Sequence, residues 1–454
     1  MTVLDRARPV AVPLSGAELD LLARLLRLPT AGPLEVGPGA TVELWAAQRV
    51  YARAAAELGF TVLRHAAPRP EELPELTPRA VRDALAADPG FLAAQPSLVL
   101  RLGPPAPAAT VMFNVHLDTV AGLEPVRVDG GRVYGRGATD AKGPAVALLA
   151  GIRAALTTEP EVATRLAVLV QAVAGEEGGA LGVFGTRPLV ELGFTGDLNV
   201  FCEPTGRRLL DRCTAAMTAC VRVDGEDAID DEPAAGHNAT VLLGALAGHL
   251  AGTLPAAAAG DGQVCVAGLH TGTLHNRVYG SGRLLLNLSY GCAATADRLA
   301  AAVDREVRTG LAAFAERHAG DPLLARTAAD AAAVTSVEWL KRDLPALAPA
   351  RPARVRAQRL AEAAGLARWP AGRPTFTCDA IWAGASARAG ALTVVFGPGE
   401  LAANHAHAAG EYAELAELER FAADVARLLG LLARQPELVR DRTDRDRTHR
   451  EEVG

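Results

Sequence analysis

The sequence lacks several features that would assign it to a specialised class of protein. Its six cysteines form no C-x-x-C pair, which argues against a structural zinc knuckle and a thioredoxin-like redox site. The first residues lack the apolar stretch of a signal peptide, and we find no run of about 18 apolar residues that would cross a membrane. Positive charge is not in excess, because the net charge is −6, which argues against nucleic acid or an anionic membrane as a partner. With cysteines scattered along the chain, these absences predict a cytoplasmic protein.

The order of the sequence patterns predicts a domain inserted into another domain. At 454 residues the chain is too long for one core, so we expect two or three domains. Apolar runs alternate with helical patterns over residues 1–207. Residues 208–325 read as strand, helix, two strands and a long helix, which is typical of a small α+β layer. Helices and one apolar strand return in 326–438, and we expect a disordered tail of mixed charge at 439–454. The prediction is a catalytic domain in two pieces, with 208–325 between them.

The catalytic pieces predict an α/β fold, with a largely parallel sheet flanked by helices. Their apolar runs are short, rich in β-branched residues and separated by helices, as in sheets that are covered on both faces. The expected strands are SLVLRL, TVMFNV, RLAVLVQAVA, DLNVFC and LTVVFG. We expect helices at 16–27, capped by Ser15, at 42–58, and near 78–86, 183–192, 355–366 and 411–434.

Acidic and histidine side chains follow three successive strands of the expected sheet. His116 and Asp118 come directly after TVMFNV, Glu176 and Glu177 after RLAVLVQAVA, and Glu203 after DLNVFC. The carboxyl ends of parallel strands meet at one edge of a sheet, where ligands bind. We therefore expect these side chains to converge in space.

Two further segments bring ligand-type residues to the same edge. Asp140 lies in the Gly-rich segment GRGATDAKG, which opens a helix, and His405 and His407 lie one loop beyond LTVVFG. Each of these residues alone is more often an ordinary polar residue, but their joint placement favours a metal site. Carboxylate and imidazole without thiolate suit zinc, with cobalt or manganese as substitutes.

The motifs that carry these residues resemble those of a known enzyme family. In order along the chain they are VHLDTV, GRGATDAKGP, AGEEGG, CEPTG and GPG…AHAAGEY. They are similar to the dinuclear zinc aminoacylase and carboxypeptidase family, which includes acetylornithine deacetylase, succinyl-diaminopimelate desuccinylase and glutamate carboxypeptidase. The resemblance covers about residues 15–434. It implies a zinc-peptidase-like catalytic domain, with the inserted domain acting as a lid and in dimerisation.

The resemblance also implies which residues hold two divalent metals. His116 and Glu203 would bind one metal, Glu177 and His407 would bind the other, and Asp140 would bridge both. Two cations close together repel each other, so they require a shared carboxylate.

The remaining motif residues have implied roles beside the metals. Glu176 would act as general base toward a metal-bridging water. Asp118 would orient the ring of His116 without binding the metal itself. The choice between the last two histidines is open. His407 stands four residues before Glu411, as the family's AH-x-x-x-E segment requires, whereas His405 keeps the usual distance from GPG. We favour His407.

The inserted domain departs from the family pattern. Relatives carry a histidine that stabilises the oxyanion, but Ile229 occupies the aligned position. His237, His270 or His275 are possible substitutes, although each is more simply read as an ordinary surface or helix-start histidine.

Asn276 matches a family asparagine that holds the substrate. The usual carboxylate-binding arginine is missing from the strand LLLNLSYG, and Arg277 or Arg283 could replace it. Relatives also carry Thr or Ser where CDAIW has Cys378.

We therefore expect a cytoplasmic homodimeric hydrolase that cleaves an amide bond of a small N-acylated amino acid, amine or dipeptide. The alternative is a family scaffold recruited for amide formation or rearrangement in a specialised biosynthetic pathway, motivated by Ile229 and the missing arginine. A third reading is a metal-binding or interaction module without catalysis.

Overall fold

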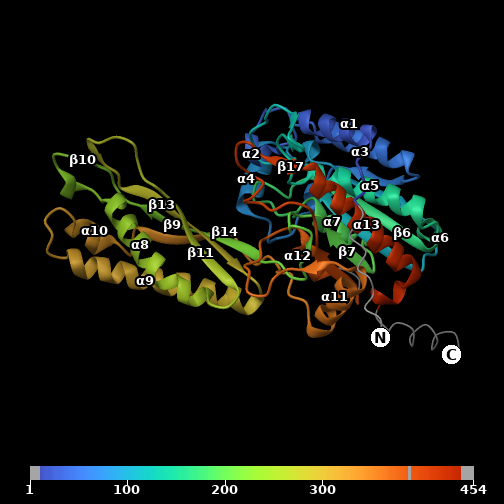
Figure 1. Ribbon diagram of the computed structural model, residues 1–454. Helices are drawn as coiled ribbons and strands as arrows, with labels where there is room; N and C mark the ends of the chain where they lie inside the picture. Colours follow the sequence, from blue (N-terminus) through green and yellow to red (C-terminus); the bar gives the residue numbers. More distant parts are fainter. Residues whose placement is uncertain (1–10, 387–389, 441–454) are drawn as a thin grey trace. The chain divides into compact units, whose positions relative to one another are not determined.

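A computed structural model describes residues 11–386 and 390–440 of the chain (Figure 1). The chain divides into two compact units. The larger comprises the chain up to Cys213, Leu347–Arg373 and the chain from Cys378 onward. The smaller comprises Thr214–Ala346 together with Pro374–Thr377. The expected charged tail lies outside the described residues from residue 441 on.

A six-stranded sheet forms the centre of the larger unit. Only β2 runs against the other strands, because it pairs antiparallel with both β1 and β6, whereas β3 pairs parallel with β6 and β7, and β7 pairs parallel with β16. The expected, largely parallel sheet is thus confirmed. In spatial order the strands are β1 (Thr61–Ala66), β2 (Ser97–Leu102), β6 (Leu166–Val173), β3 (Ala109–His116), β7 (Leu198–Phe201) and β16 (Leu392–Val395).

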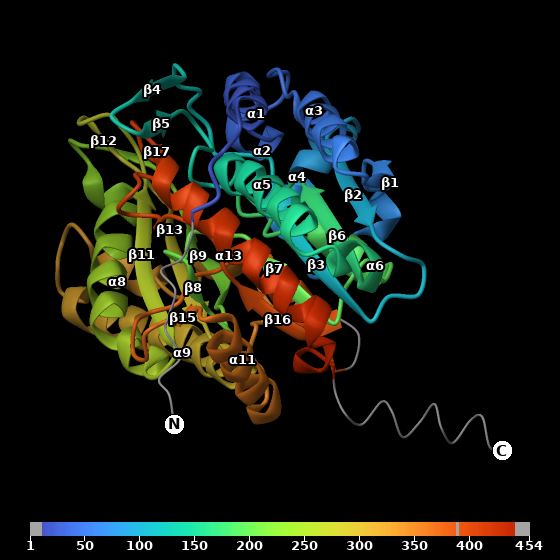
Figure 2. The same ribbon diagram turned by 45° about the vertical axis from the view of Figure 1, so that its right-hand side comes forward.

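Helices cover both faces of this sheet, which explains why its central strands are apolar throughout. Alternate residues of β2 point to opposite sides, so that Leu98 and Leu100 join the main core while Val99 packs with Leu189 on the other face. The helices α5 and α13 lie side by side over the main core (Figure 2). The helices of this unit are α1 (Gly16–Arg27), α2 (Pro33–Val36), α3 (Leu44–Glu57), α4 (Arg79–Ala87), α5 (Lys142–Thr158), α6 (Glu161–Arg165), α7 (Thr186–Glu191), α11 (Arg351–Ala364), α12 (Ala380–Ser386) and α13 (Leu415–Arg434).

A small antiparallel sheet joins two loops of the larger unit that are distant in sequence. It consists of β4 (Arg127–Asp129), β5 (Arg132–Tyr134) and β17 (Tyr412–Glu414). The sequence prediction began the last helix at residue 411, but residues 412–414 form β17 and the helix begins at Leu415. A three-residue strand has too little sequence pattern to be recognised, because its pairing partner lies far away along the chain. The pairing of β17 with β5 brings the loops beside them together.

The smaller unit is an antiparallel sheet with helices packed against it. Its strands, in spatial order, are β11 (Gly262–His270), β13 (Ser281–Tyr290), β9 (Ala215–Asp224) and β14 (Thr335–Lys341). The helices are α8 (Ala239–Thr253), α9 (Ala293–His318) and α10 (Ala325–Asp330), and a short ribbon pairs β10 (Ala228–Ile229) with β12 (Arg277–Val278). The α+β composition follows the prediction.

The boundaries of the smaller unit differ from the predicted range 208–325. The unit begins at Thr214 and continues to Ala346, because β14 pairs with β9 at the edge of its sheet. The sequence TSVEWLK has only a weak alternation of polar and apolar residues, so sequence reasoning assigned it to the catalytic domain. Residues 374–377 return briefly to the same unit.

One helical segment meets the length and composition criteria of a membrane span. Among the described residues, Ala239–Ala258 alone has the length and mean hydropathy, 1.5, of a membrane-spanning helix, and 33% of its most apolar window is buried. The sequence reading overlooked it, since Gly and Pro interrupt the run while no Asp, Glu, Lys or Arg does. A single helix of this kind is weak support for a span, because buried core helices meet the same criteria.

Candidate metal centre

The ligand-type residues of the larger unit converge at the carboxyl edge of its sheet. His116 is the last residue of β3, Glu176 and Glu177 follow β6, and Glu203 follows β7. Asp140 lies just before α5. All four segments reach the edge at which the parallel strands end, as the strand order requires.

Three overlapping groups of these side chains place ligand atoms within 4.8 Å of one another. The groups are His116, Asp140 and Glu203; Asp140, Glu177 and His407; and His116, Glu176 and Glu177. The Asp140 carboxylate is shared between two groups: its Oδ1 lies 3.0 Å from His116 Nε2, and its Oδ2 lies 3.0 Å from His407 Nε2. One carboxylate thus faces two imidazoles through its two oxygens.

Asp118 connects the end of β3 to the turn that carries the two glutamates. Its Oδ2 accepts hydrogen bonds from the main-chain N–H groups of Gly175, at 3.0 Å, and Glu177, at 3.1 Å. Gly175 has φ of +76°, and a Cβ there would lie 2.1 Å from the Phe184 ring, so only glycine fits this turn.

His116 is held by the main chain of Asp118 more closely than by its carboxylate. His116 Nδ1 lies 3.0 Å from the Asp118 carbonyl oxygen and 3.7 Å from Asp118 Oδ1. A carbonyl oxygen can only accept, so Nδ1 carries the hydrogen. In the neutral ring Nε2 then presents its lone pair to the centre, which is the tautomer that a metal requires.

The cluster concentrates negative charge in a buried space. Burial raises the pKa of Glu203 to about 8 and that of Asp379 to about 7. Burial, together with the nearby Glu177, also raises the pKa of Glu176 well above its ordinary value. A cation bound beside these carboxyl groups would lower their pKa values, because it stabilises the ionised form.

The two imidazoles respond in the opposite sense. Hydrogen bonds to Asp140 and Glu177 raise the pKa of His407 to about 10. Burial would lower the pKa of His116, but its hydrogen bonds to Asp118 and Asp140 raise it well above the ordinary value. Each imidazole therefore takes up positive charge from a proton when no other cation is present.

The donor set fits two divalent cations. Six carboxyl groups, those of Asp118, Asp140, Glu176, Glu177, Glu203 and Asp379, lie around two imidazoles. The carboxyl groups outnumber the imidazoles, so bound cations would stabilise their ionised forms. Glu177 Oε1 is buried without a hydrogen bond of good geometry, although His407 Nε2 lies 3.0 Å away. Oxygen and nitrogen donors without sulfur suit zinc, cobalt or manganese.

His405 and His407 differ in their surroundings. The His405 ring packs edge-on against Tyr412, with centroids 5.9 Å apart, whereas His407 faces Asp140 and Glu177. Both histidines have left-handed backbone conformations, with φ of 56° and 63°. Such a conformation costs a non-glycine residue about 1–2 kcal/mol, so neighbouring contacts must hold the loop in place.

The candidate substrate residues lie in the smaller unit. Asn276 is exposed, and Arg277 forms an ion pair with Asp227 at 2.5 Å. Ile229, which is 57% exposed, lies directly opposite Arg277 in the ribbon of β10 and β12.

His237 has the character of a structural residue rather than of a replacement for the missing histidine. It is 4% exposed, its Nδ1 accepts the N–H of Glu226, and its Nε2 lies 3.2 Å from Asp330. Both ring nitrogens thus already have partners within the smaller unit.

Sequence reasoning did not assign a role to two acids of the larger unit. Asp379 is buried, and Thr186 Oγ1 donates a hydrogen bond of 2.5 Å to its Oδ2. Glu411 served only to align the histidine before it, but its carboxylate is buried and bound by several donors. The motif spacing was the single signal for Glu411, and the departure of CDAIW from the family pattern was the signal for Asp379.

A carboxylate–imidazole cluster at the carboxyl edge of a mostly parallel sheet offers the donors that a metal-dependent hydrolase needs. Residues 112–430 match the model of peptidase family M20/M25/M40, which is more than half of the chain, so the chain belongs to this family. The family expected from the motifs, the α/β fold class and the class of hydrolases of amide or peptide bonds are confirmed.

Individual relatives agree with this membership. An Aeropyrum pernix protein provisionally named LysW-lysine/LysW-ornithine hydrolase is 35% identical over 108 residues, a match that spans 20% of this chain and only 30% of that relative. The dipeptidase Dug1p of Saccharomyces cerevisiae is 12% identical with a TM-score of 0.62, covering 92% of this chain and 96% of that one. The Bacillus subtilis YxeP protein, described as a dinuclear metal binding peptidase, is 12% identical with a TM-score of 0.55, covering 91% and 97%. At these identities the structural likeness concerns the fold alone.

Proposed function

We propose that the protein is a metal-dependent amidohydrolase that cleaves an amide bond of a small N-acylated amino acid, amine or dipeptide. The observation that carries the proposal is the Asp140 carboxylate, whose two oxygens face two separate groups of ligand atoms. Family membership and the names of relatives, a hydrolase of lysine or ornithine derivatives and a dipeptidase, support amide-bond cleavage in small substrates.

In this proposal five side chains hold two zinc ions, for which cobalt or manganese can substitute. His116 and Glu203 complete one site, Glu177 and His407 complete the other, and Asp140 belongs to both. When bound, such metals polarise an amide carbonyl and lower the pKa of water toward neutrality.

Glu176 is the proposed general base. Its carboxyl lies with His116 and Glu177 in one group of ligand atoms, but it belongs to neither of the two groups that contain Asp140, which leaves it free to act as a base. It takes a proton from water as the water oxygen adds to the amide carbon. It then gives that proton to the nitrogen as the carbon–nitrogen bond breaks.

Asn276 and Arg277 are the proposed substrate-binding residues of the smaller unit. The Arg277 guanidinium already binds the carboxylate of Asp227, which supports its ability to bind a substrate carboxylate in the same geometry. Binding a substrate requires the exchange of one carboxylate for another.

The proposed assembly is a homodimer that forms through the smaller unit. The outer side of α8 presents Val241, Gly244, Ala245 and Gly248, which are exposed and uncharged, and β11 is an edge strand. Sedimentation should therefore give a dimer for the wild type and a monomer for Gly248→Glu, and a wild-type monomer would refute the assembly. All six cysteines are free and four are buried, which supports a cytoplasmic location.

The test is hydrolysis of a panel of N-acyl amino acids and dipeptides by protein loaded with zinc or cobalt. Glu176→Gln should lower kcat by about 10²–10⁴-fold, because it removes the proton carrier, and should leave both metals bound. Silence of the metal-loaded wild type across the panel would count against hydrolysis. Activity that appears only with an activated or carrier-bound partner would favour the second candidate, amide formation. The observation that supports this candidate is Ile229, which stands where relatives have a histidine.

A further inference from the structure

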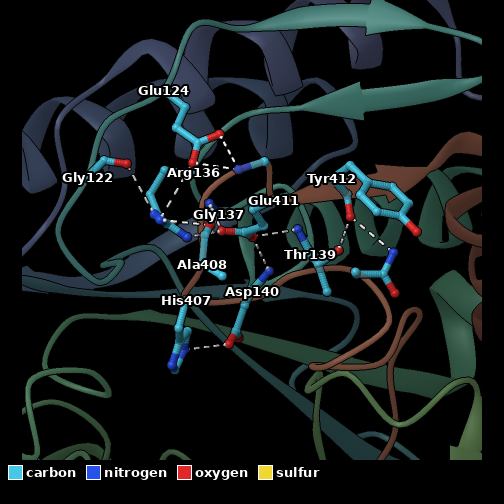
Figure 3. A network of polar contacts seen from close by, with 12 residues as sticks. Gly122, Glu124, Arg136, Gly137, Thr139, Asp140, His407, Ala408, Glu411 and Tyr412 are labelled. Carbon is cyan, nitrogen blue, oxygen red and sulfur yellow. Dashed lines mark hydrogen bonds and ion pairs between the residues drawn. The ribbon is translucent and has the colours of Figure 1, made fainter.

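Glu411 is a buried carboxylate that binds the loop carrying Asp140 (Figure 3). Its Oε1 accepts the main-chain N–H groups of Thr139, at 2.9 Å, and of Asp140 itself, at 3.2 Å. Its Oε2 accepts the N–H of Gly137 at 3.1 Å and Nη1 of Arg136 at 2.7 Å. All four donors belong to the loop between β5 and α5, whereas Glu411 belongs to the loop of His407.

Arg136 binds the His407 loop in return. Its Nη2 donates to the carbonyl of Ala408, the residue after His407, at 3.1 Å, and its Nε donates to the carbonyl of Gly122 at 3.2 Å. Glu124, 3.8 Å from Arg136, accepts the N–H of Gly410 on both of its oxygens, at 2.9 and 3.0 Å. The network therefore ties three loops to one another.

Asp140 and His407 depend on these ties because neither lies in a helix or strand. Asp140 precedes α5, and His407 lies in a loop with a left-handed backbone. The two side chains must nevertheless be placed within a few tenths of an ångström for a metal to bind between them. Figure 3 shows the network next to Asp140 and His407, above them in that view.

We propose that Glu411 and Arg136 are positioning residues that hold Asp140 and His407 at the separation needed for metal binding. The inference rests on the proposed function, because it assigns the metal site to these two ligands. Neither positioning residue contacts the metal, and each acts through the main chain of the loop that carries a ligand.

Glu411→Gln tests the inference with a minimal change of shape. Each carboxylate oxygen accepts two donors, so the amide –NH₂ of glutamine would face two N–H groups wherever it points. Arg136→Lys keeps the charge beside Glu411 but loses the planar fork that reaches Ala408 and Gly122. Glu414→Gln is the matched control, since Glu414 lies on the same segment and pairs with Arg132 at the surface.

The measurement is the pair of stepwise zinc and cobalt dissociation constants, obtained by competition with a chelator, together with the visible spectrum of the cobalt protein. Glu411→Gln and Arg136→Lys should each weaken at least one constant by about 10–100-fold and alter the cobalt spectrum. Glu414→Gln should leave both constants and the spectrum as in the wild type. Circular dichroism of the metal-free proteins checks that each variant is folded.

Unchanged metal constants in folded Glu411→Gln or Arg136→Lys would overturn the inference, as would an equal loss in Glu414→Gln. Should Glu411→Gln fail to fold, Arg136→Lys alone decides, because it retains the buried ion pair. A wild-type protein that takes up no metal would refute the proposed function and this inference together. Normal metal binding by the wild type and by both variants would refute the inference alone.

Discussion

Replacement of His407 by asparagine should remove one metal of the pair, whereas the same replacement of His405 should not. His407 Nε2 lies 3.0 Å from both Asp140 Oδ2 and Glu177 Oε1, but the His405 ring packs on Tyr412. Asparagine tolerates the left-handed backbone that both histidines adopt, so the loop should keep its shape. The two variants are therefore matched in chemistry and backbone strain.

The size of the effect follows from sharing a binding free energy among ligands. Structural zinc sites with four ligands bind with about 10–16 kcal/mol, so one ligand contributes roughly 3 kcal/mol. At about 1.4 kcal/mol for each tenfold change, loss of His407 should weaken one dissociation constant about 100-fold. The constant of the site formed by His116, Asp140 and Glu203 should change much less, because none of its ligands is altered.

Elemental analysis after dialysis against a weak chelator gives the metal content of each variant. We expect two metals per chain in the wild type and in His405→Asn, and one in His407→Asn. Two metals in His407→Asn combined with one in His405→Asn would refute the assignment of this ligand.

Two further predictions concern pH. Metal binding at neutral pH should release protons, because the pKa of His407 is raised to about 10 and that of His116 is also raised, so both imidazoles hold protons that they must lose to bind a metal. Calorimetry in buffers of different ionisation enthalpy should show this release, and the metal affinity should fall as the pH is lowered. Metal binding without proton release would contradict the prediction. The pKa of Glu18 is lowered, because its hydrogen bonds with Arg153 and Ser15 outweigh the opposite effect of burial. The ion pair between Glu18 and Arg153 therefore stabilises the fold fully above the ordinary pKa of 4.5, and this stabilisation is lost as the pH falls through the lowered pKa. Glu18→Gln should lower the free energy of unfolding at pH 7 by about 1 kcal/mol and flatten its acid dependence, and an unchanged acid dependence in denaturant titrations would contradict this.

The sequence predicted that these ligand-type side chains converge, because their positions depend on where strands end. His116, Glu177 and Glu203 each stand at the carboxyl end of an apolar run, and parallel strands align those ends at one edge. The order of the motifs supplied Asp140. The separation of the ligand atoms could not be predicted, since it is set by loop contacts between residues far apart along the chain.

The parts that sequence reasoning missed share a physical cause. The strands β14 and β17 owe their structure to pairing with β9 and β5 rather than to their own residues, so local pattern does not reveal them. The network of Arg136 and Glu411 joins residues 275 positions apart. A buried ion pair of this kind is invisible to periodicity, because burial of a charge follows from its partner and not from the local sequence.

The most direct test of the account is X-ray diffraction from crystals of zinc-loaded protein, with data collected at the zinc absorption edge. The account predicts two anomalous peaks a few ångströms apart with the Asp140 carboxylate between them, one peak against His116 and Glu203 and the other against Glu177 and His407. No zinc at this cluster in crystals of fully loaded protein, or zinc bound only elsewhere on the chain, would contradict it.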